Sequence, residues 1–556
     1  MNHKPLPIGI DNFEKLISKG YYYVDKSLFI KELIDNMSEV SLFTRPRRFG
    51  KSLNMSMLQH FFEIRRDSTP LFKNLKIMSA GEKYVSHMNQ YPVINLTFKA
   101  SGKLNFKSSI DKLKDELIRE FGRHQYLLDD NTLNNYRKEH FQKILSKSAS
   151  VDDYSGSLRF LSDCLEQHHN KKVIILLDEY DVPLGNAFFN GFYEEMIDFI
   201  RSLLGDALKT NPSLEFAVLT GCLRISKESI FTGLNNLDVI SILSDNYGEY
   251  YGFTEEELKD ALSYYHLESK AEEAERWYNG YLFGNTNVYN PWSVIHFIKD
   301  SLVNIKCKPK SYWSNTSSNN IIRTLIEKSG KEEKDEIETL ISGGKIVVPI
   351  HEDVTYEDID TSMKNLWNFL FFTGYLKKVD ETYENENLIF TLSIPNHEVL
   401  TIYKRKIREW FDEKIKMSNL SEFMNAILEK DTEKLMGELN IRLSNTISFY
   451  DTAENFYHGF LLGILSNIDN YMVKSNRESG LGRSDIFLKS TGIEKKAAIF
   501  ECKVLKENDD AEEKCQEALQ QINDKRYDAE LIQLGYKEII KYGIVFRGKQ
   551  CMIIAE

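Results

Sequence analysis

The feature that most constrains the fold is an unbroken apolar run, residues 173–177, that ends directly in two acids, Asp178 and Glu179. A run of β-branched and aliphatic residues without polar interruption is typical of a strand buried on both faces, as in a parallel sheet between helices. In such sheets, functional groups gather beyond the carboxyl ends of the strands. The run therefore predicts an α/β domain with an acidic site at one edge of its sheet.

A second strand, near the N-terminus, leads into a loop that ends in Gly50-Lys51-Ser52. Residues 41–44 are largely apolar, and a helix is expected over residues 53–62. A phosphate-binding loop requires this order, because backbone N–H groups and the helix N-terminus then face the phosphates. Lys51 would reach the terminal phosphates of ATP, and the Ser52 hydroxyl would bind Mg²⁺.

The acids after the buried strand complete this hypothesis. Asp178 would hold Mg²⁺ through water, and Glu179 would polarise the attacking water; a core strand followed by an acidic loop is the structural alternative. Loop and strand together predict a P-loop nucleotide-binding domain. Arg45 stands where the usual G-x-x-x-x-G-K-[ST] pattern has its first glycine, and a non-glycine residue makes a turn with positive φ less easy.

Four further residues of this region have open roles. Arg47 and Arg48 would add charge beside the triphosphate, contact DNA phosphates or reach the nucleotide of a neighbouring subunit; solvated charge is the alternative. A third strand, residues 215–221, carries Thr220 near its end and leads to Arg224. Thr220 could sense the γ-phosphate and Arg224 could stabilise transition-state charge, or both could be structural.

The C-terminal region holds a second acidic constellation. Residues 482–488 and 497–505 are expected to form two short strands. Side chains alternate along a strand, so Glu501 and Lys503 project to one side, and a hairpin brings Asp485 beside them. Two carboxylates and a lysine on one sheet face suit a divalent cation that activates water against a phosphodiester. A surface cluster of salt bridges is the alternative.

Neighbouring segments support the nuclease interpretation. Residues 453–465 are expected to form a buried, mostly apolar helix with one acid, Glu454, which is costly to bury unless it is paired or binds a metal. By alternation, Cys502 faces away from Glu501 and is expected in the core. Further on, a helix that includes Gln521 precedes a strand at residues 542–546.

The C-terminal region resembles the PD-(D/E)XK nuclease superfamily. Asp485 falls at the Asp of that motif, Glu501 and Lys503 at its E-x-K, and Glu454 at the acid often supplied by the first core helix. Gln521 resembles a helix glutamine of several branches, with a solvent-facing residue as the alternative. The resemblance implies cleavage with Mg²⁺ or Mn²⁺ that yields 5′-phosphate and 3′-hydroxyl ends, with DNA favoured over RNA as substrate.

The chain as a whole resembles the AAA-ATPase-like family, in which a C-terminal PD-(D/E)XK domain is common. In that family, arginine in place of the first P-loop glycine is the usual form. The resemblance is carried by six segments, residues 6–10, 22–27, 44–52, 177–181, 225–231 and 289–293.

Composition sets limits on the partners. With 42% hydrophobic and 28% charged residues and no apolar run of bilayer length, the chain is expected to be a cytoplasmic protein without a membrane partner. Its six cysteines lack metal-ligand spacing and suggest reduced thiols. A net charge of −12 argues against tight, generic coating of DNA. Contact with nucleic acid should be local, metal-assisted or made by a homo-oligomer.

Three domains are expected: a P-loop AAA-ATPase-like α/β domain over residues 1–245, a helical lid or connector over 246–434, and an α/β PD-(D/E)XK nuclease-like domain over 435–556. Within the connector, Thr254 and Glu257 predict a capping box. The favoured function is a metal-dependent nuclease under ATP control. One alternative is a non-cleaving ATPase switch whose C-terminal domain only binds nucleic acid, and another is a scaffold with a structural nucleotide.

Overall fold

The computed structural model describes most of the chain: residues 3–129, 131–224, 235–313, 320–352, 356, 362–384, 387–417, 420–444, 454–468, 470–475, 485–491, 495–506 and 509–556. The chain forms two compact units. Unit 1 comprises Met1–Ile321 and Lys345–Ile402, and unit 2 comprises Ile322–Gly344 and Tyr403–Glu556. One boundary between them falls inside a single helix, α19 (His397–Met417).

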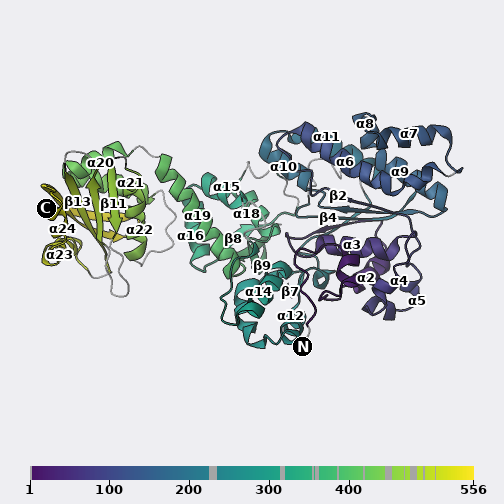
Figure 1. The fold of residues 1–556 in the computed structure, drawn as a ribbon, viewed down its shortest axis with the longest axis horizontal. Helices are drawn as coiled ribbons and strands as arrows, with labels where there is room; N and C mark the ends of the chain where they lie inside the picture. Colours follow the sequence, from purple (N-terminus) through teal and green to yellow (C-terminus); the bar gives the residue numbers. More distant parts are fainter. Residues whose placement is uncertain are drawn as a thin grey trace. The chain divides into compact units, whose positions relative to one another are not determined.

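Unit 1 is built on a five-stranded parallel sheet in the order β2-β3-β4-β1-β5. Its strands are β1 (Val40–Thr44), β2 (Val93–Thr97), β3 (Val173–Asp178), β4 (Leu214–Gly221) and β5 (Leu237–Ile240). Helices cover both faces, with α6 (Phe106–Arg123), α9 (Ser157–His169) and α11 (Tyr193–Leu208) on one and α2 (Leu28–Asn36) and α3 (Lys51–Phe62) on the other (Figure 1). Every residue of β3 is buried, as the apolar run predicts. The predicted α/β class is confirmed.

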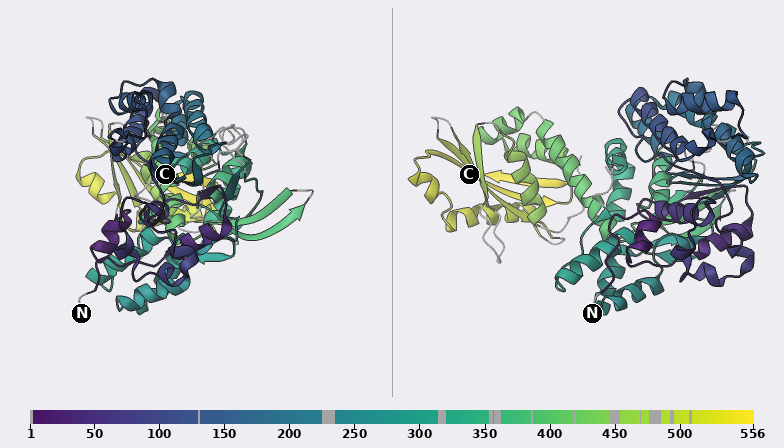
Figure 2. Two further views of the ribbon diagram at one scale, coloured as in Figure 1. Left: turned by 90° about the vertical axis from the view of Figure 1, so that its right-hand side faces the viewer. Right: turned by 45° about the vertical axis from the view of Figure 1, so that its right-hand side comes forward.

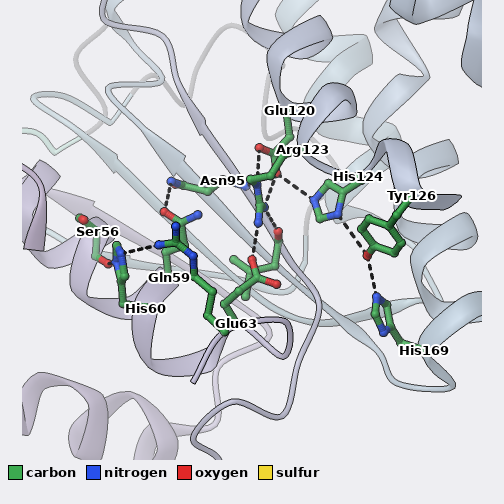
Figure 3. Close-up of polar contacts among 12 residues, drawn as sticks. Ser56, Gln59, His60, Glu63, Asn95, Glu120, Arg123, His124, Tyr126 and His169 are labelled. Atoms are coloured by element: carbon green, nitrogen blue, oxygen red, sulfur yellow. Dashed lines mark hydrogen bonds and ion pairs between the residues drawn. The ribbon is translucent and has the colours of Figure 1, made fainter. Parts of the chain in front are cut away.

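A buried ion cluster fastens α6 to the sheet and to the end of α3 (Figure 3). Arg123 donates to both oxygens of Glu120, at 3.0 and 2.6 Å, and also to Glu63. The backbone N–H of Asn95 on β2 donates to Glu120 at 2.9 Å. Burial alone would raise the pKa of Glu120, but the charge of Arg123 and hydrogen bonds from His124 and Arg123 outweigh it and hold the pKa at about 2. Its charge is therefore compensated inside the fold.

The predicted helices after the sheet are present, and short strands accompany them. Thr254 and Glu257 form the predicted capping box at the start of α12 (Glu255–Tyr264). In this region the described residues also form five strands that the sequence did not predict, β6 (Tyr281–Phe283), β7 (Thr286–Val288), β8 (Ile346–Pro349), β9 (Lys377–Glu384) and β10 (Asn387–Ser393). Figure 2, left, shows β9 and β10 as a projecting two-stranded ribbon. Because β9 is mostly exposed and β6 and β7 are three residues long, none carries a long alternating pattern.

A buried carboxylate, Glu398, joins the start of α19 to helix α14 (Pro291–Val303). It accepts hydrogen bonds from the Ser293 hydroxyl at 2.7 and 3.0 Å and from the backbone N–H of Trp313 at 2.8 Å. Burial raises the pKa of Glu398 to about 7, although these hydrogen bonds act to lower it. The folded unit therefore favours the protonated acid over a pH range in which the unfolded chain carries the charge.

We expect Glu398→Gln to stabilise the chain at pH 8 and to lose most of that advantage at pH 5. The protonated acid contributes stability that is complete below the ordinary pKa of 4.5 and is lost as the pH rises through about 7. At pH 8 the free energy of unfolding of Glu398→Gln should exceed that of wild type by roughly 3 kcal/mol, since each unit of pKa difference between the folded and unfolded states corresponds to about 1.4 kcal/mol. Thermal midpoints of wild type and variant between pH 5 and pH 8 check this, and parallel pH profiles would contradict it.

Unit 2 holds a five-stranded mixed sheet in the order β11-β12-β13-β14-β15. Its strands are β11 (Tyr471–Ser475), β12 (Asp485–Ser490), β13 (Lys496–Val504), β14 (Glu538–Arg547) and β15 (Gln550–Ala555). On one face, apolar residues of α20 (Ser421–Leu428), α21 (Thr432–Ser444) and α22 (Glu454–Leu465) form the main core, which includes Cys502 as predicted. On the other face, Ile522 of α23 (Ala511–Asp524) packs against Phe487 and Ile499.

Candidate nucleotide and nuclease sites

The loop between β1 and α3 is sharply bent just before the helix. Helix α3 begins at Lys51, two residues earlier than predicted, and Gly50 precedes it with φ of 87°. Arg48 has φ of 71°, a conformation that costs a non-glycine residue roughly 1–3 kcal/mol and is concentrated at functional sites. A helix N-terminus at such a loop favours anions.

Arg45 lies beneath this loop and is fully buried. Its Nη1 donates to the carbonyl oxygens of Thr44 at 3.0 Å and Ile240 at 2.9 Å. The guanidinium carbon lies 5.2 Å from the ring centroid of Tyr251 and 5.0 Å from that of Phe283. Burial lowers the pKa of Arg45 to about 10. Since Arg45 is not among the residues with positive φ, the tight turn falls at Arg48 and Gly50, and arginine replaces the first glycine without that strain.

The predicted magnesium ligands lie in contact at the carboxyl edge of the sheet. Ser52 Oγ donates to Asp178 Oδ2 at 2.6 Å, and Thr220 Oγ1 donates to Asp178 Oδ1 at 2.6 Å. Strand β4 lies next to β3, so Thr220 reaches the Asp178 carboxylate from the adjacent strand and bonds the oxygen that Ser52 does not. Lys51 Nζ donates to the carbonyl oxygens of Arg45 at 2.8 Å and Pro46 at 2.9 Å.

This donor set fits Mg²⁺ and a nucleotide. Hydroxyl and carboxylate oxygens are the ligands that Mg²⁺ prefers, and Ser52 and Asp178 supply one of each. Besides its two carbonyl bonds, the Lys51 ammonium contacts Cys222 Sγ at 3.8 Å, and a phosphate oxygen would displace this weak acceptor from the third donor. The Thr220 hydroxyl holds the Asp178 carboxylate in place and also accepts a hydrogen bond from the backbone N–H of Glu179, at 3.3 Å.

Glu179 follows Asp178 with φ of 55°, another position with left-handed backbone. Burial raises the pKa of Glu179, and the neighbouring Asp178 carboxylate raises it further. An acid whose pKa moves toward neutrality is better suited to accept a proton from water. The next acid, Asp181, has a different role, because its Oδ2 accepts hydrogen bonds from the backbone N–H groups of Cys222 and Leu223 and so fixes the loop after β4.

Two cavities meet at this edge. The larger, of about 420 Å³, is lined by all the predicted nucleotide-binding residues except Asp178, and also by Glu179. Asp178 and Ser52 line a neighbouring cavity of about 330 Å³. The larger volume lies within the range of small-molecule sites, roughly 300–1,000 Å³. The structure therefore brings the residues predicted for ATP together around these two adjoining cavities.

In unit 2, a glutamine joins the predicted catalytic pair. Gln521 Nε2 on α23 donates to Glu501 Oε1 at 2.6 Å, and Lys503 Nζ donates to Gln521 Oε1 at 3.0 Å. Glu501 is buried, and both residues of the pair lie on β13 two positions apart. The solvent-facing alternative for Gln521 is therefore wrong, since its amide bridges the acid and the lysine.

For the remaining predicted acids, Asp485 and Glu454, the structure gives the position of the backbone. Strands β12 and β13 pair antiparallel, with Asp485 directly opposite Glu501, so the predicted hairpin partner is in register. Glu454 is the first residue of α22. The side chains of Asp485 and Glu454 lie outside the described part of the chain. Within that described part, no group of three or more His, Cys, Asp or Glu side chains is arranged to hold a metal ion.

The sequence did not predict several residues around the nucleotide cavity. Its lining includes Pro7, Lys99, Trp292 and Ile295, of which Pro7 and Trp292 lie in segments noted only for the family resemblance. The Asn-Pro-Trp order at the start of a helix was an available signal for a fixed aromatic ring. Residues 225–231, another segment of that resemblance, lie outside the described residues.

Comparisons with known proteins agree with these two sites. A family model described as a predicted AAA-ATPase matches residues 7–231, and one described as the PD-(D/E)XK nuclease superfamily matches residues 452–556. An "uncharacterized protein in vnfD 5'region" of Azotobacter chroococcum mcd 1 is 30% identical over 333 residues, 59% of this chain and 57% of that protein. The match thus spans little more than half the length of this curated relative.

The two matched regions coincide with the two sites described above. The first contains the phosphate-loop residues and Asp178, and the second contains Glu501, Lys503 and Gln521. Among the described residues, no helix is both long enough and apolar enough to cross a membrane. The chain therefore carries an AAA-ATPase-like domain followed by a domain of the PD-(D/E)XK nuclease superfamily.

Proposed function

We propose that this protein is a metal-dependent nuclease that cleaves DNA under the control of ATP. The observation that carries the proposal is the Glu501–Gln521–Lys503 group on the sheet of unit 2, with Asp485 opposite Glu501 in register. The domain types support ATPase and nuclease-type roles, and a nuclease-type domain implies a nucleic-acid partner.

At the nuclease site, Asp485 and Glu501 would hold Mg²⁺ or Mn²⁺, with Glu454 as a further ligand. A bound divalent cation lowers the pKa of water and offsets charge on the phosphate. Lys503 would stabilise the negative charge that develops on the scissile phosphate. Gln521 holds Lys503 and Glu501 in one geometry and so limits the reorganisation that the reaction requires.

At the nucleotide site, Lys51 would contact the terminal phosphates, and Arg47, Arg48 and Gly50 would line the approach to them. Ser52 and Asp178 would hold Mg²⁺, and Glu179 would take the proton of the attacking water. The short Ser52–Asp178–Thr220 chain of hydrogen bonds already sets these oxygens before nucleotide binds.

Control by ATP is supported by the route of the chain between the two sites. Helix α14 borders the nucleotide cavity through Trp292 and Ile295, and its Ser293 bonds Glu398 at the start of α19. Helix α19 begins in unit 1 and ends in unit 2. Residues 246–434, between the two matched regions, would act as the connector.

The test measures two reactions of the purified full chain. Cleavage of plasmid and linear DNA is followed with Mg²⁺ or Mn²⁺ and with excess EDTA, and phosphate release is followed with Mg²⁺ and ATP. We expect metal-dependent scission with 5′-phosphate ends and ATP turnover. ATP turnover without scission of any DNA substrate would favour the non-cleaving switch, and neither reaction would refute the proposal.

A further inference from the structure

The nucleotide cavity is lined by both polar and apolar side chains. Lys51, Arg47 and Ser52 supply charges and a hydroxyl that suit phosphates. The lining also contains apolar residues that border a smaller apolar recess of about 80 Å³, namely Pro7, Leu16, Leu53, Pro291 and Ile295. A ligand that joins an anionic group to a flat apolar one matches this lining.

Trp292, half-buried in the lining of the cavity, is held by the start of α14. The side-chain oxygen of Asn290 accepts hydrogen bonds from the backbone N–H groups of Trp292 at 3.0 Å and Ser293 at 3.3 Å. Pro291 occupies the first position of the helix, where its fixed φ suits the helical backbone. Ser293, the next residue, is tied to Glu398. The backbone that carries the indole ring is therefore fixed on both sides.

A planar cation already lies on that ring. The guanidinium carbon of Arg48 is 4.2 Å from the ring centroid of Trp292, and both residues line the cavity. Guanidinium groups, which are planar cations, and nucleobases, which are planar π systems, both stack on the faces of aromatic rings. Arg48 is exposed and lies on the strained loop, so its side chain can leave the ring more easily than the ring can move.

We propose that Trp292 is the stacking platform for the adenine base of ATP, in the place taken by the Arg48 guanidinium. The inference rests on the proposed ATP site, which fixes the phosphate end at Lys51. Trp292 and Ile295 lie beyond residues 7–231, the region that the AAA-ATPase model matches. The base end of the nucleotide site is therefore supplied by a helix of the connector, which makes that helix a direct sensor of bound nucleotide.

The test separates base binding from phosphate binding in the full chain. Calorimetric titrations with Mg²⁺ compare AMP-PNP with inorganic tripolyphosphate, which has the phosphates and no base. Trp292→Ala should weaken AMP-PNP binding by at least about tenfold, the range expected for loss of one base–aromatic stack. It should leave tripolyphosphate affinity unchanged, while Lys51→Ala should weaken both probes. Trp292→Phe should keep most of the AMP-PNP affinity.

Trp277→Ala is the matched control. Trp277 is also half-buried, lies on the preceding helix α13 (Ala271–Tyr278) and contacts His397 instead of the cavity. Its variant should bind both probes like wild type. A second readout is fluorescence, because AMP-PNP should quench emission in wild type and much less in Trp292→Phe.

The outcomes distinguish the two proposals. If Trp292→Ala binds AMP-PNP as tightly as wild type while Lys51→Ala binds it more weakly, the stacking role is overturned and the proposed ATP site is retained. An equal loss of AMP-PNP and tripolyphosphate affinity in Trp292→Ala would also overturn it, because the ring would then act through the loop. Failure of wild type to bind either probe would refute the ATP site and this inference with it.

Discussion

Replacing Lys503 by alanine should reduce DNA cleavage by at least about a hundredfold, the cost of losing one group that stabilises transition-state charge. ATP hydrolysis should stay at the wild-type rate, since Lys503 lies in unit 2 and the nucleotide cavity is lined by residues of unit 1. Cleavage of supercoiled plasmid and phosphate release, measured on the same preparations, check both halves of this prediction.

The structure offers a matched control for charge. Lys506 lies just after β13 and is exposed, so Lys506→Ala removes the same charge from the same segment and should cleave like wild type. Gln521→Ala should lose less activity than Lys503→Ala, because it removes the bridge and leaves the cation. Equal loss in Lys503→Ala and Lys506→Ala would show that net charge matters and would contradict a catalytic role.

The second large effect is expected for Lys51→Ala, which should lower ATP hydrolysis by at least about a hundredfold. Lys51 is the buried cation at the start of α3, and its ammonium lies against the carbonyl oxygens of Arg45 and Pro46 at the head of the phosphate loop. Without it, the phosphates lose their nearest positive charge. Phosphate release at saturating and limiting ATP separates a loss of binding from a loss of turnover.

Two controls accompany the prediction for Lys51→Ala. Lys73→Ala removes an exposed lysine of the same unit and should hydrolyse ATP normally. Because Lys51 also ties the loop together, the thermal midpoint of Lys51→Ala is measured beside its activity. A variant that folds like wild type and still hydrolyses ATP at the wild-type rate would remove Lys51 from the site.

The sequence predicts the parts of this fold that have strong patterns. The buried run before Asp178 specified β3, and the alternation around Glu501 and Lys503 specified the face of β13 that meets Gln521. Both follow from strict periodicity in buried strands. Short or exposed strands such as β7 and β9 escaped prediction because pairing with neighbours, not their own pattern, makes them strands.

Long-range contacts explain the rest of what the sequence does not show. Arg45 is buried between Tyr251 and Phe283, and Trp292 borders the same cavity as Lys51. Each of these arrangements joins segments more than 200 residues apart in the chain. The Thr220–Asp178 bond likewise needs the strand order, with β4 between β1 and β3. No local pattern encodes which distant strand ends meet, so the residues of each motif and a hairpin partner such as Asp485 are predictable, whereas partners from distant segments are not.

Control of cleavage in unit 2 by nucleotide bound in unit 1, as proposed above, can be measured through the rate of plasmid cleavage. This rate is compared with Mg²⁺, in the presence and absence of ATP, for wild type, Lys51→Ala and Lys503→Ala. We expect ATP to change the wild-type rate, Lys51→Ala to cleave at a rate indifferent to ATP, and Lys503→Ala not to cleave. A wild-type rate that is the same with and without ATP, or a Lys51→Ala variant that responds to ATP as wild type does, would contradict it.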